Sequence, residues 1–467
     1  MTALSAAQRA GVPRGKGGAT KKRARGANPP IEYSLLLTAT LCLLAFGAVM
    51  VFSASSTTSV LGASGDGAEY LKRTLLFGGV GLLAMRFLSN RGLAAARQLT
   101  PALLCISFLL LVVVLVPGVG LEANGAQRWL GAGPIQLQPS ELAKLALILY
   151  GAHLIASRPT TVRDVRSMLP YLIVVGVACG LIVIEPDLGS ALVAGFSVAA
   201  LLIAGGSRLR HLALITAALA FVVVIAIAME PYRQDRLTGF LNPTADAAGS
   251  GFQGIQASIA LGSGGLFGVG LGESVQKAFY LPEAHTDMIA AVIGEELGLV
   301  GITVLVGLFG LFGYAGFRTA QRAGDRYGKL LATGLTALVL TQAVVNLFAV
   351  MGLAPLTGVP LPFVSYGNSN LLVMLCAVGL MLNIARGGRA PARARTPRAR
   401  PARKRPSRPA SGRRPARGAK LRVLDGGRIP ATARRRNEQP GGNGRDSRGR
   451  NRRARGAGAR RRGRAAR

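Results

Sequence analysis

The chain has 467 residues, 50% of them hydrophobic, and carries a formal net charge of +36. A single soluble globule would not combine so much apolar surface with so much positive charge, so the two kinds of residue must occupy different parts of the chain. Most basic residues lie in 1–28 and 386–467, which are rich in Arg, Ala, Gly and Pro. Such segments cannot bury enough surface to fold alone. We predict disordered basic tails at 1–32 and 386–467 around a membrane core at 33–385.

Apolar runs of about 17 to 25 residues, the length that an α-helix needs to cross a hydrocarbon core of about 30 Å, fill the region between the tails. They predict an all-α polytopic membrane protein with about ten transmembrane helices and a large extracytoplasmic loop between the seventh and the eighth. The expected spans are 34–54, 74–90, 99–117, 141–157, 169–185, 188–204, 211–229, 288–316, 330–352 and 370–385. The 288–316 run exceeds one crossing, so its first part is either span or a short interfacial or re-entrant helix.

Lysine and arginine are unevenly distributed among the short loops, and positive residues are retained on the cytoplasmic side of a membrane. If both termini are cytoplasmic, the connections on that side hold many cations, namely Arg91, Arg97, Arg158, Arg163, Arg166, Arg208, Arg210, Arg318, Arg322, Arg326 and Lys329. The opposite loops hold few, namely Lys72, Arg73, Arg128, Arg233, Arg236 and Lys277. We therefore predict that both tails are cytoplasmic and that the few external cations have a specific role.

Ionisable residues are concentrated in the segment YLPEAHTDMIAAVIGEE at 280–296, which holds one histidine and four carboxylates beside apolar spans. Charge near hydrocarbon costs at least a few kcal/mol, so residues of this kind in a membrane protein usually serve function. The segment is expected to handle a polar substrate, a proton or an ion. Glu295 and Glu296 lie deepest, and either of them could instead satisfy a helix break or a neighbouring cation.

The loop 230–286 contains the glycine-rich stretch GFQGIQASIALGSGGLFGVGLG at 251–272. No strand precedes it and no βαβ pattern surrounds it, which argues against a dinucleotide fingerprint. Two uses stay open: close backbone approach to a polar ligand, or plain loop flexibility. No CxxC or CxxH spacing indicates a metal site.

Seven stretches in order resemble the SEDS (shape, elongation, division, sporulation) family of membrane proteins, and specifically its cell-division branch. They are MVFSASS at 50–56, NGAQRWLGAGPIQLQPSELAKLA at 124–146, EPDLGSAL at 185–192, RLTGFLNPTAD at 236–246, GSGGLFGVGLGES at 262–274, YLPEAHTDMIAAVIGEELGLVG at 280–301 and PLPFVSYGNSNL at 360–371. The resemblance implies a peptidoglycan glycosyltransferase that polymerises lipid II on the outer face of the cytoplasmic membrane, at the division septum. It also implies a class B penicillin-binding transpeptidase and other divisome proteins as partners.

Polymerisation breaks the anomeric bond to pyrophosphate while a sugar 4-hydroxyl attacks, and an α-linked donor giving a β-linked product indicates one inverting displacement. One general base is the minimum requirement. The resemblance implies Asp287, which ends the PEAHTD match where the family carries its essential aspartate. Partial desolvation beside an apolar run should also raise its pKa. The structural alternative is that Thr286 or Asp287 caps the helix that follows.

Further substrate-binding residues are implied by the resemblance. The family's QPSE-x-x-K motif lines its central cavity, here with Gln138, Ser140, Glu141 and Lys144. The i, i+3 spacing puts Glu141 and Lys144 on one helical face, where a structural ion pair is the alternative role. Asp187 lies in a very short turn after Glu185, and it either belongs to the same cavity or caps the next helix.

The external cations best placed to bind pyrophosphate or peptide carboxylates are Arg73, Arg233, Arg236 and Lys277, with lipid headgroups as the alternative ligand. His285 is either a second proton carrier or a hydrogen-bonded support for its neighbour Asp287. The segment LPFVSYGNSN at 361–370 resembles the family's re-entrant external loop, which implies substrate contacts for Ser365, Gly367 and Ser369. Asn368 and Asn370 depart from the family pattern; the first change keeps the turn possible, and the second alters a potential ligand.

The pyrophosphate leaves as an anion and needs positive charge, either from side chains or from a divalent cation such as Mg²⁺. The Arg-rich tails favour anionic lipid headgroups over specific nucleic acid and fit a high-GC actinobacterial source. Two other function classes stay open. A lipid II flippase or transporter should show repeated halves with broken helices, and a non-catalytic division scaffold would need no external base.

Overall fold

The computed structural model describes residues 30–388 except 62–65, 124–125, 133–134, 159–161, 163 and 279. These residues belong to one compact unit, Met1–Thr396. The predicted tails at 1–32 and 386–467 fall almost entirely outside the described residues.

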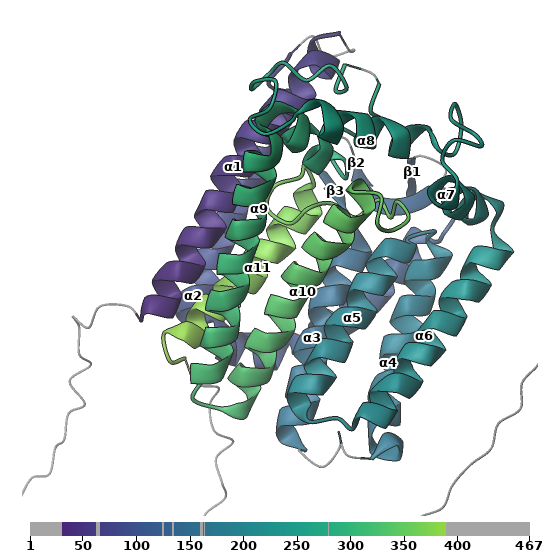
Figure 1. Ribbon diagram of the computed structural model, residues 1–467. Helices are drawn as coiled ribbons and strands as arrows, with labels where there is room; N and C mark the ends of the chain where they lie inside the picture. The colour runs from purple at the N-terminus through teal and green to yellow at the C-terminus, as the bar shows by residue number, and fades with distance from the viewer. Residues whose placement is uncertain are drawn as a thin grey trace, which may run out of the picture. The chain divides into compact units, whose positions relative to one another are not determined.

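The described residues form helices with one small sheet (Figure 1). The helices are α1 (Ile31–Leu61), α2 (Glu69–Val114), α3 (Pro139–Ser157), α4 (Val165–Ile184), α5 (Leu188–Gly205), α6 (Leu209–Met229), α7 (Pro231–Leu241), α8 (Phe252–Ser263), α9 (Ile289–Arg322), α10 (Arg326–Val350) and α11 (Asn368–Ala385). The strands β1 (Leu121–Ala123), β2 (Ala126–Ala132) and β3 (Ile135–Leu137) pair antiparallel in that order.

Within the described ranges, eight helices are long and apolar enough to cross a membrane: α1, α2, α4, α5, α6, α9, α10 and α11. The predicted polytopic all-α fold is therefore confirmed, with the small sheet as an addition. The expected span 141–157 corresponds to α3, which carries Glu141 and Lys144 and is not among the eight. The expected spans 74–90 and 99–117 both lie in α2.

The two expected spans in α2 are joined by helical residues rather than by a loop. The backbone carbonyl of Ser89 accepts a hydrogen bond from the Asn383 side chain, near the end of α11, at 2.8 Å. After α2 the chain enters the sheet, where the carbonyl of Gln136 accepts from Ser369 at the start of α11, at 2.9 Å. The second half of α2 thus leads the chain back along the bundle to the end where α11 begins.

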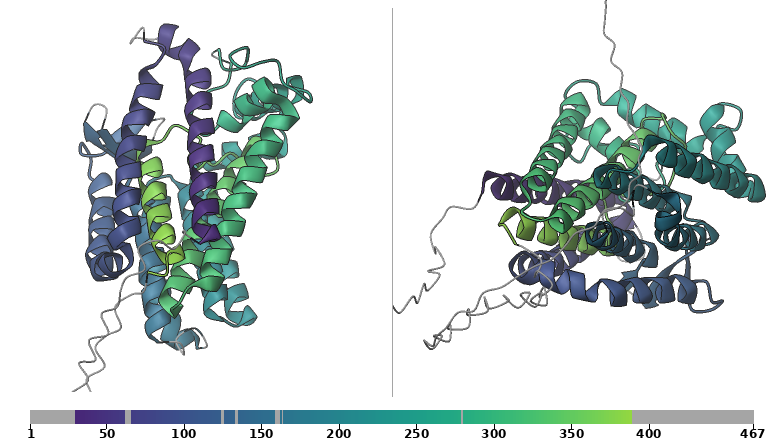
Figure 2. Two further views of the ribbon diagram at one scale, coloured as in Figure 1. Left: turned by 90° about the vertical axis from the view of Figure 1, so that its left-hand side faces the viewer. Right: turned by 90° about the horizontal axis from the view of Figure 1, so that it is seen from below.

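The helices α10 and α11 form the buried centre of the bundle, flanked by α1, α2 and α9 on one side and by α3 and α5 on the other (Figures 1 and 2). Small residues let these helices approach closely: a Cβ on Gly379 of α11 would lie 2.7 Å from the backbone oxygen of Met85 in α2. The helix α6 lies at the edge of the bundle and is largely exposed.

The predicted loop 230–286 contains two helices, α7 and α8, which lie across the same end of the bundle as the sheet (Figure 1). Its glycine-rich part packs on α9, whose backbone leaves helical geometry at Gly298 with a φ of 64°. The amides of Val269 and Gly270 donate to the carbonyls of Glu295 and Glu296 at 3.0 and 3.1 Å. The glycines therefore permit close backbone approach to a helix kink, and these N–H groups are not available to a ligand.

Candidate functional site

Asp287 lies directly before α9 and is half-buried. Burial, and next the charge of Glu283, raise its pKa to about 6, while Arg236 acts in the opposite direction. The N-cap residue of α9 is Met288, and no side-chain hydrogen bond caps the helix. The capping alternative for Thr286 or Asp287 is therefore wrong, and the Asp287 carboxylate remains available for chemistry.

Arg128 of β2 and Asp287 both lie near Gly358. The Arg128 Nη1 and the Asp287 Oδ2 each lie 3.9 Å from the point that a Cβ on Gly358 would occupy. These two atoms can be no farther apart than twice that distance. The φ of Gly358 is +69°, a backbone conformation that residues other than glycine and asparagine rarely adopt. The missing side chain of Gly358 therefore leaves a small space that borders both a cation and the predicted base.

Arg128 is held at the turn between α4 and α5. Its Nε donates to the carbonyl of Glu185 at 3.2 Å, and its Nη2 donates to the carbonyl of Pro186. The Glu185 side chain is 0% exposed, and neither of its carboxyl oxygens has a hydrogen-bond partner among the described residues. Burial, and next the charge of Asp187, raise the Glu185 pKa to about 9, so this carboxyl is neutral at pH 7.

Asp187 joins three segments of the predicted cavity. It is the N-cap of α5, where its carboxylate accepts from the amide of Ser190 at 3.0 Å. It also accepts from Gln138 Nε2 at 2.9 Å and from Ser140 Oγ at 3.3 Å. The Ser369 hydroxyl in turn accepts from the backbone N–H of Gln138 at 3.0 Å. Residues of three sequence-predicted motifs thus meet in one hydrogen-bonded cluster, and Asp187 caps α5, while its contact with a substrate stays a prediction.

Glu141 and Lys144 form a buried ion pair of 2.9 Å, with Lys144 only 1% exposed. Lys144 Nζ also donates to Gln342 Oε1 at 3.1 Å, and Gln342 Nε2 donates to the carbonyl of Pro360 at 3.0 Å. The pair therefore supports the loop 351–367, which contains Gly358.

Lys277 belongs to a separate buried cluster. Its Nζ lies 2.8 Å from Glu296 and 3.3 Å from Ser53 of α1, and the Ser53 hydroxyl also donates to Glu296. The neighbouring Glu295 accepts from the Ser274 hydroxyl and from the amide of Val275. These contacts fasten the loop before Asp287 to α1 and α9, so Lys277 could bind a ligand only by breaking its pair with Glu296.

His285 is part of an aromatic group that the sequence did not single out. Its ring lies 4.4 Å from that of Tyr70 and 5.7 Å from that of Tyr366, and burial lowers its pKa. These ring contacts and the lowered pKa favour the neutral imidazole, and the choice between proton carrier and support for Asp287 stays a prediction. Arg73 forms an ion pair with Glu69 and contacts Tyr366, one of the two tyrosines that pack on His285.

The remaining predicted residues lie at turns and helix ends. Arg233 donates to the carbonyls of Ala226 and Val183 at 2.8 and 2.6 Å, which end α6 and α4. Ser365 Oγ accepts from the amide of Leu361 at 2.8 Å. Gly367 is the N-cap of α11 with an extended φ of 177°. Their observed contacts are structural.

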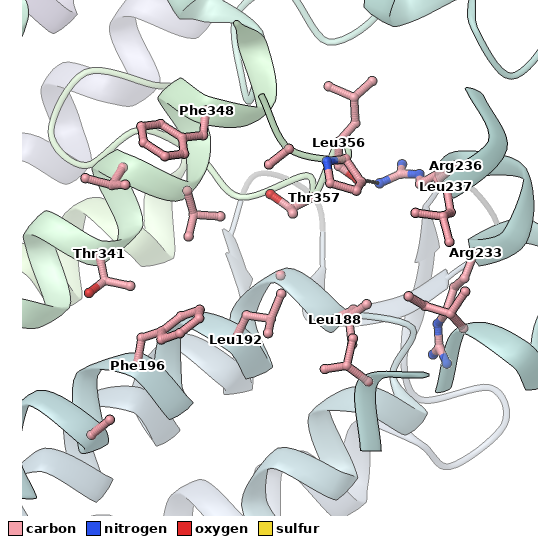
Figure 3. A pocket seen from close by; sticks show the side chains of 18 of the residues that line it. Leu188, Leu192, Phe196, Arg233, Arg236, Leu237, Thr341, Phe348, Leu356 and Thr357 are labelled. Atoms are coloured by element: carbon pink, nitrogen blue, oxygen red, sulfur yellow. Dashed lines mark hydrogen bonds between the residues drawn. The ribbon is translucent and has the colours of Figure 1, made fainter. Parts of the chain in front are cut away.

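An apolar groove of about 890 Å³ lies between α5, α6 and α10 (Figure 3). Phe196, Thr341 and Phe348 line one part of it, and Arg233 and Arg236 lie at the other, near Leu356 and Thr357. Arg236 Nη1 donates to the carbonyl of Leu356 at 3.0 Å. Pro186 lines the groove as well, and its carbonyl accepts a hydrogen bond from Arg128, so Arg128 lies next to the groove without lining it.

Two residues at this site were missed by sequence reasoning. Arg128 was visible as one of the few external cations, but nothing in the sequence placed it beside Asp287. Tyr70 sits next to Lys72 and Arg73 at the predicted membrane boundary, where aromatic residues are common, so it carried no distinct signal.

These features define a multi-pass membrane protein with a polar site at one end of its helical bundle, beside an apolar groove. A model of the cell cycle proteins FtsW, RodA and SpoVE matches residues 33–390, and the chain belongs to this family.

Two curated relatives are similar over most of their length. A "Probable peptidoglycan glycosyltransferase FtsW" of Trichlorobacter lovleyi is 44% identical over 76% of this chain and 94% of its own. The "Stage V sporulation protein E" of Bacillus subtilis is 41% identical over 76% of this chain and 97% of its own.

Two solved structures share the fold. The first, from "Structural coordination of polymerization and crosslinking by a peptidoglycan synthase complex", has a TM-score of 0.62 and 34% identity over 75% of this chain and 96% of that one. The rod shape determining protein RodA of Thermus thermophilus has a TM-score of 0.56 and 32% identity over 75% of this chain and 95% of that one.

Proposed function

We propose that the protein is a peptidoglycan glycosyltransferase that polymerises lipid II into glycan strands on the outer face of the cytoplasmic membrane. The observation that carries the proposal is the placement of Asp287, a carboxylate with a raised pKa, beside Arg128 at the polar end of an apolar groove. The substrate has a long apolar chain, a pyrophosphate and a sugar. The apolar groove suits the chain, Arg128 suits the pyrophosphate, and Asp287 suits the sugar hydroxyl. The names of the relatives support the same activity.

The reaction balances with one base. The oxygen of the acceptor's 4-hydroxyl bonds to the donor's anomeric carbon, while the bond from that carbon to the pyrophosphate oxygen breaks and its electron pair leaves with the pyrophosphate. The hydroxyl proton passes to Asp287. No acid is needed, because pyrophosphate is a stable anion. One displacement inverts the anomeric configuration, as an α-linked donor and a β-linked product require.

The surrounding residues position this base. Asn346 holds the backbone at Asp287, and the pair of Glu141 and Lys144 acts through Gln342 on the loop that carries Gly358. His285, two residues before Asp287, packs against Tyr70 and Tyr366, and a sugar bound beside Asp287 would pack against these rings.

A divalent cation such as Mg²⁺ would have to be held largely by the substrate's own phosphates and one or two carboxylates. No group of three or more His, Cys, Asp or Glu side chains in the described ranges could hold a metal ion by itself. When bound, such an ion would neutralise the leaving pyrophosphate, and no step here is routed through it.

In the cell we expect both termini in the cytoplasm, location at the division septum, and assembly with a class B penicillin-binding transpeptidase and other divisome proteins. The cation distribution among the loops and the FtsW names of relatives support this arrangement. One structural neighbour belongs to a synthase complex of polymerisation and crosslinking. The basic tails would meet anionic lipids of the inner leaflet.

Purified full-length protein mixed with lipid II and its cognate transpeptidase tests the activity, with glycan polymer separated by size. Polymer is the expected product. Movement of lipid II across vesicles without polymer would support the flippase alternative instead. Polymerisation that depends only on the partner would support the scaffold alternative.

A further inference from the structure

The space left by the missing side chain of Gly358 borders Arg128 and Asp287. Within 4 Å of the Cβ position of Gly358, only Arg128 Nη1 and Asp287 Oδ2 are found among the described residues. The geometry leaves room for a ligand atom that contacts the guanidinium and lies close to the carboxylate. Gly358 follows Leu356 and Thr357, which line the apolar groove.

Arg128 has no carboxylate partner within ion-pair distance among the described residues. The two groups that it contacts are backbone carbonyls at the end of α4. The nearby Glu185 carboxyl is buried without a partner and is neutral at pH 7, so it does not neutralise the guanidinium. An anion that enters the space would meet an arginine that is already oriented.

A second cation lies near the same loop. Arg236 is bonded to the carbonyl of Leu356 and is close enough to Asp287 to lower its pKa. Arginine is well suited to phosphate groups, because its planar fork donates two parallel hydrogen bonds. The two arginines thus lie near the same short loop, Arg236 at Leu356 and Arg128 at Gly358, next to residues that line the apolar groove.

We propose that Arg128 binds the diphosphate of a lipid-linked sugar donor in the space beside Gly358, with Arg236 as the second cation and the lipid chain in the apolar groove. This inference rests on the proposed function and names the cation that receives the leaving group. An anion held there also stabilises the protonated form of the nearby Asp287, which makes this carboxylate a stronger base when the donor is bound.

The test is a binding measurement that does not depend on turnover. The chain has a single tryptophan, Trp129, directly after Arg128, so its fluorescence reports on ligands at this place. Full-length protein in detergent is titrated with farnesyl diphosphate, farnesol, inorganic pyrophosphate and phosphatidylglycerol. We expect the wild type to bind farnesyl diphosphate at least about tenfold more tightly than farnesol or phosphatidylglycerol.

The Arg128→Gln variant should lose this preference while it keeps its affinity for farnesol, and Arg128→Lys should keep only part of it. As a matched control, Lys329→Gln removes an exposed cation at the far end of α10 and should keep the wild-type preference. A folded Arg128→Gln variant with an unchanged preference would overturn the proposal. So would equal affinity of the wild type for farnesyl diphosphate and phosphatidylglycerol.

A second variant protects the test against misfolding, since Arg128 also bonds to the end of α4. Gly358→Asn keeps Arg128 and can adopt the positive φ, but its side chain occupies the space. It should lose the diphosphate preference in the same way, and an unchanged preference here would contradict the proposal.

The failure of this inference is distinct from the failure of the proposed function. Asp287→Asn should keep the diphosphate preference and lose polymerisation. A wild type that shows the preference but makes no polymer would contradict the glycosyltransferase and leave the diphosphate site standing. A wild type that polymerises, with Arg128→Gln keeping the preference, would contradict the site alone.

Discussion

Asn346 of α10 and the backbone of Asp287 are joined by a hydrogen bond of 2.7 Å, from the Asn346 Nδ2 to the Asp287 carbonyl. The same nitrogen donates to the carbonyl of Val359 at 2.8 Å. One amide group thus fixes the predicted base and the loop with Gly358 relative to each other. This contact sets the width of the space in which the reaction is proposed to occur.

Asn346→Ala should therefore lower kcat for polymerisation by about 10- to 100-fold, because the base is no longer fixed relative to the loop with Gly358. The free energy of unfolding should fall as well, since two buried carbonyls lose a donor at roughly 1–3 kcal/mol each. KM should change less, since the groove and its arginines are untouched. The exposed Asn90, at the opposite end of the bundle, gives a matched control, and Asn90→Ala should behave as the wild type. A loss confined to KM, or a kcat equal to that of the wild type, would argue against this positioning role.

The pH dependence of polymerisation follows from the Asp287 pKa of about 6. The base must be ionised, so the rate should fall as the pH drops below about 6. Glu283 raises this pKa and Arg236 lowers it. The acid limb of the rate profile should therefore move to lower pH in Glu283→Gln and to higher pH in Arg236→Gln. If the acid limbs of the two variants moved in the same direction, the assignment of the base to Asp287 would be contradicted.

Glu185 should make the folded protein less stable as the pH rises. Its folded pKa of about 9 lies above the ordinary value of 4.5, so its favourable contribution is complete below 4.5 and is lost as the pH approaches 9. Glu185→Gln has no such loss. The Tm of this variant minus that of the wild type, measured in detergent, should increase from pH 6 to pH 8.5. A difference that stays constant would show that the carboxyl is not held neutral.

The buried pair of Glu141 and Lys144 gives a separate test. Lys144→Met leaves a buried carboxylate without its cation and should cost about 3–5 kcal/mol in the free energy of unfolding. The double variant Glu141→Gln with Lys144→Met removes both charges and should recover most of that loss in chemical denaturation. If the double variant is as unstable as the single one, the two residues do not stabilise the fold as a pair.

The polytopic all-α fold could be predicted from the sequence, because a run of about 20 apolar residues has few alternatives in a membrane protein. The number of spans could not: about ten were expected, and eight helices in the described ranges are long and apolar enough to cross a membrane. The continuity of α2 could not be predicted either. The segment 91–98 is polar enough to end two hydrophobic runs, yet it is rich in alanine and remains helical. Hydropathy reports burial in lipid and does not report where a helix stops.

Contacts within and between motifs could be expected from the sequence, as for Asp187 and the pair in α3. The role of Asp287 as the base stays a prediction. Partners that lie far apart in the chain could not be expected. Lys277 reads as a free external cation, but Ser53, which lies 224 residues away, joins it and Glu296 in one buried cluster. Arg128 reaches the α4–α5 turn across 57 residues. Such contacts depend on how the helices pack, which local sequence does not encode.

The most direct test of the account is a single-turnover assay of lipid II polymerisation by Asp287→Asn in the purified complex with the transpeptidase. The substitution keeps the shape of the side chain and removes its ability to accept a proton. Glu273→Gln, a neutralised exposed carboxylate in the same external segment, is the matched control. We predict no detectable polymer from a folded Asp287→Asn enzyme and full activity from the control, whereas polymer at the wild-type rate from Asp287→Asn would contradict the account.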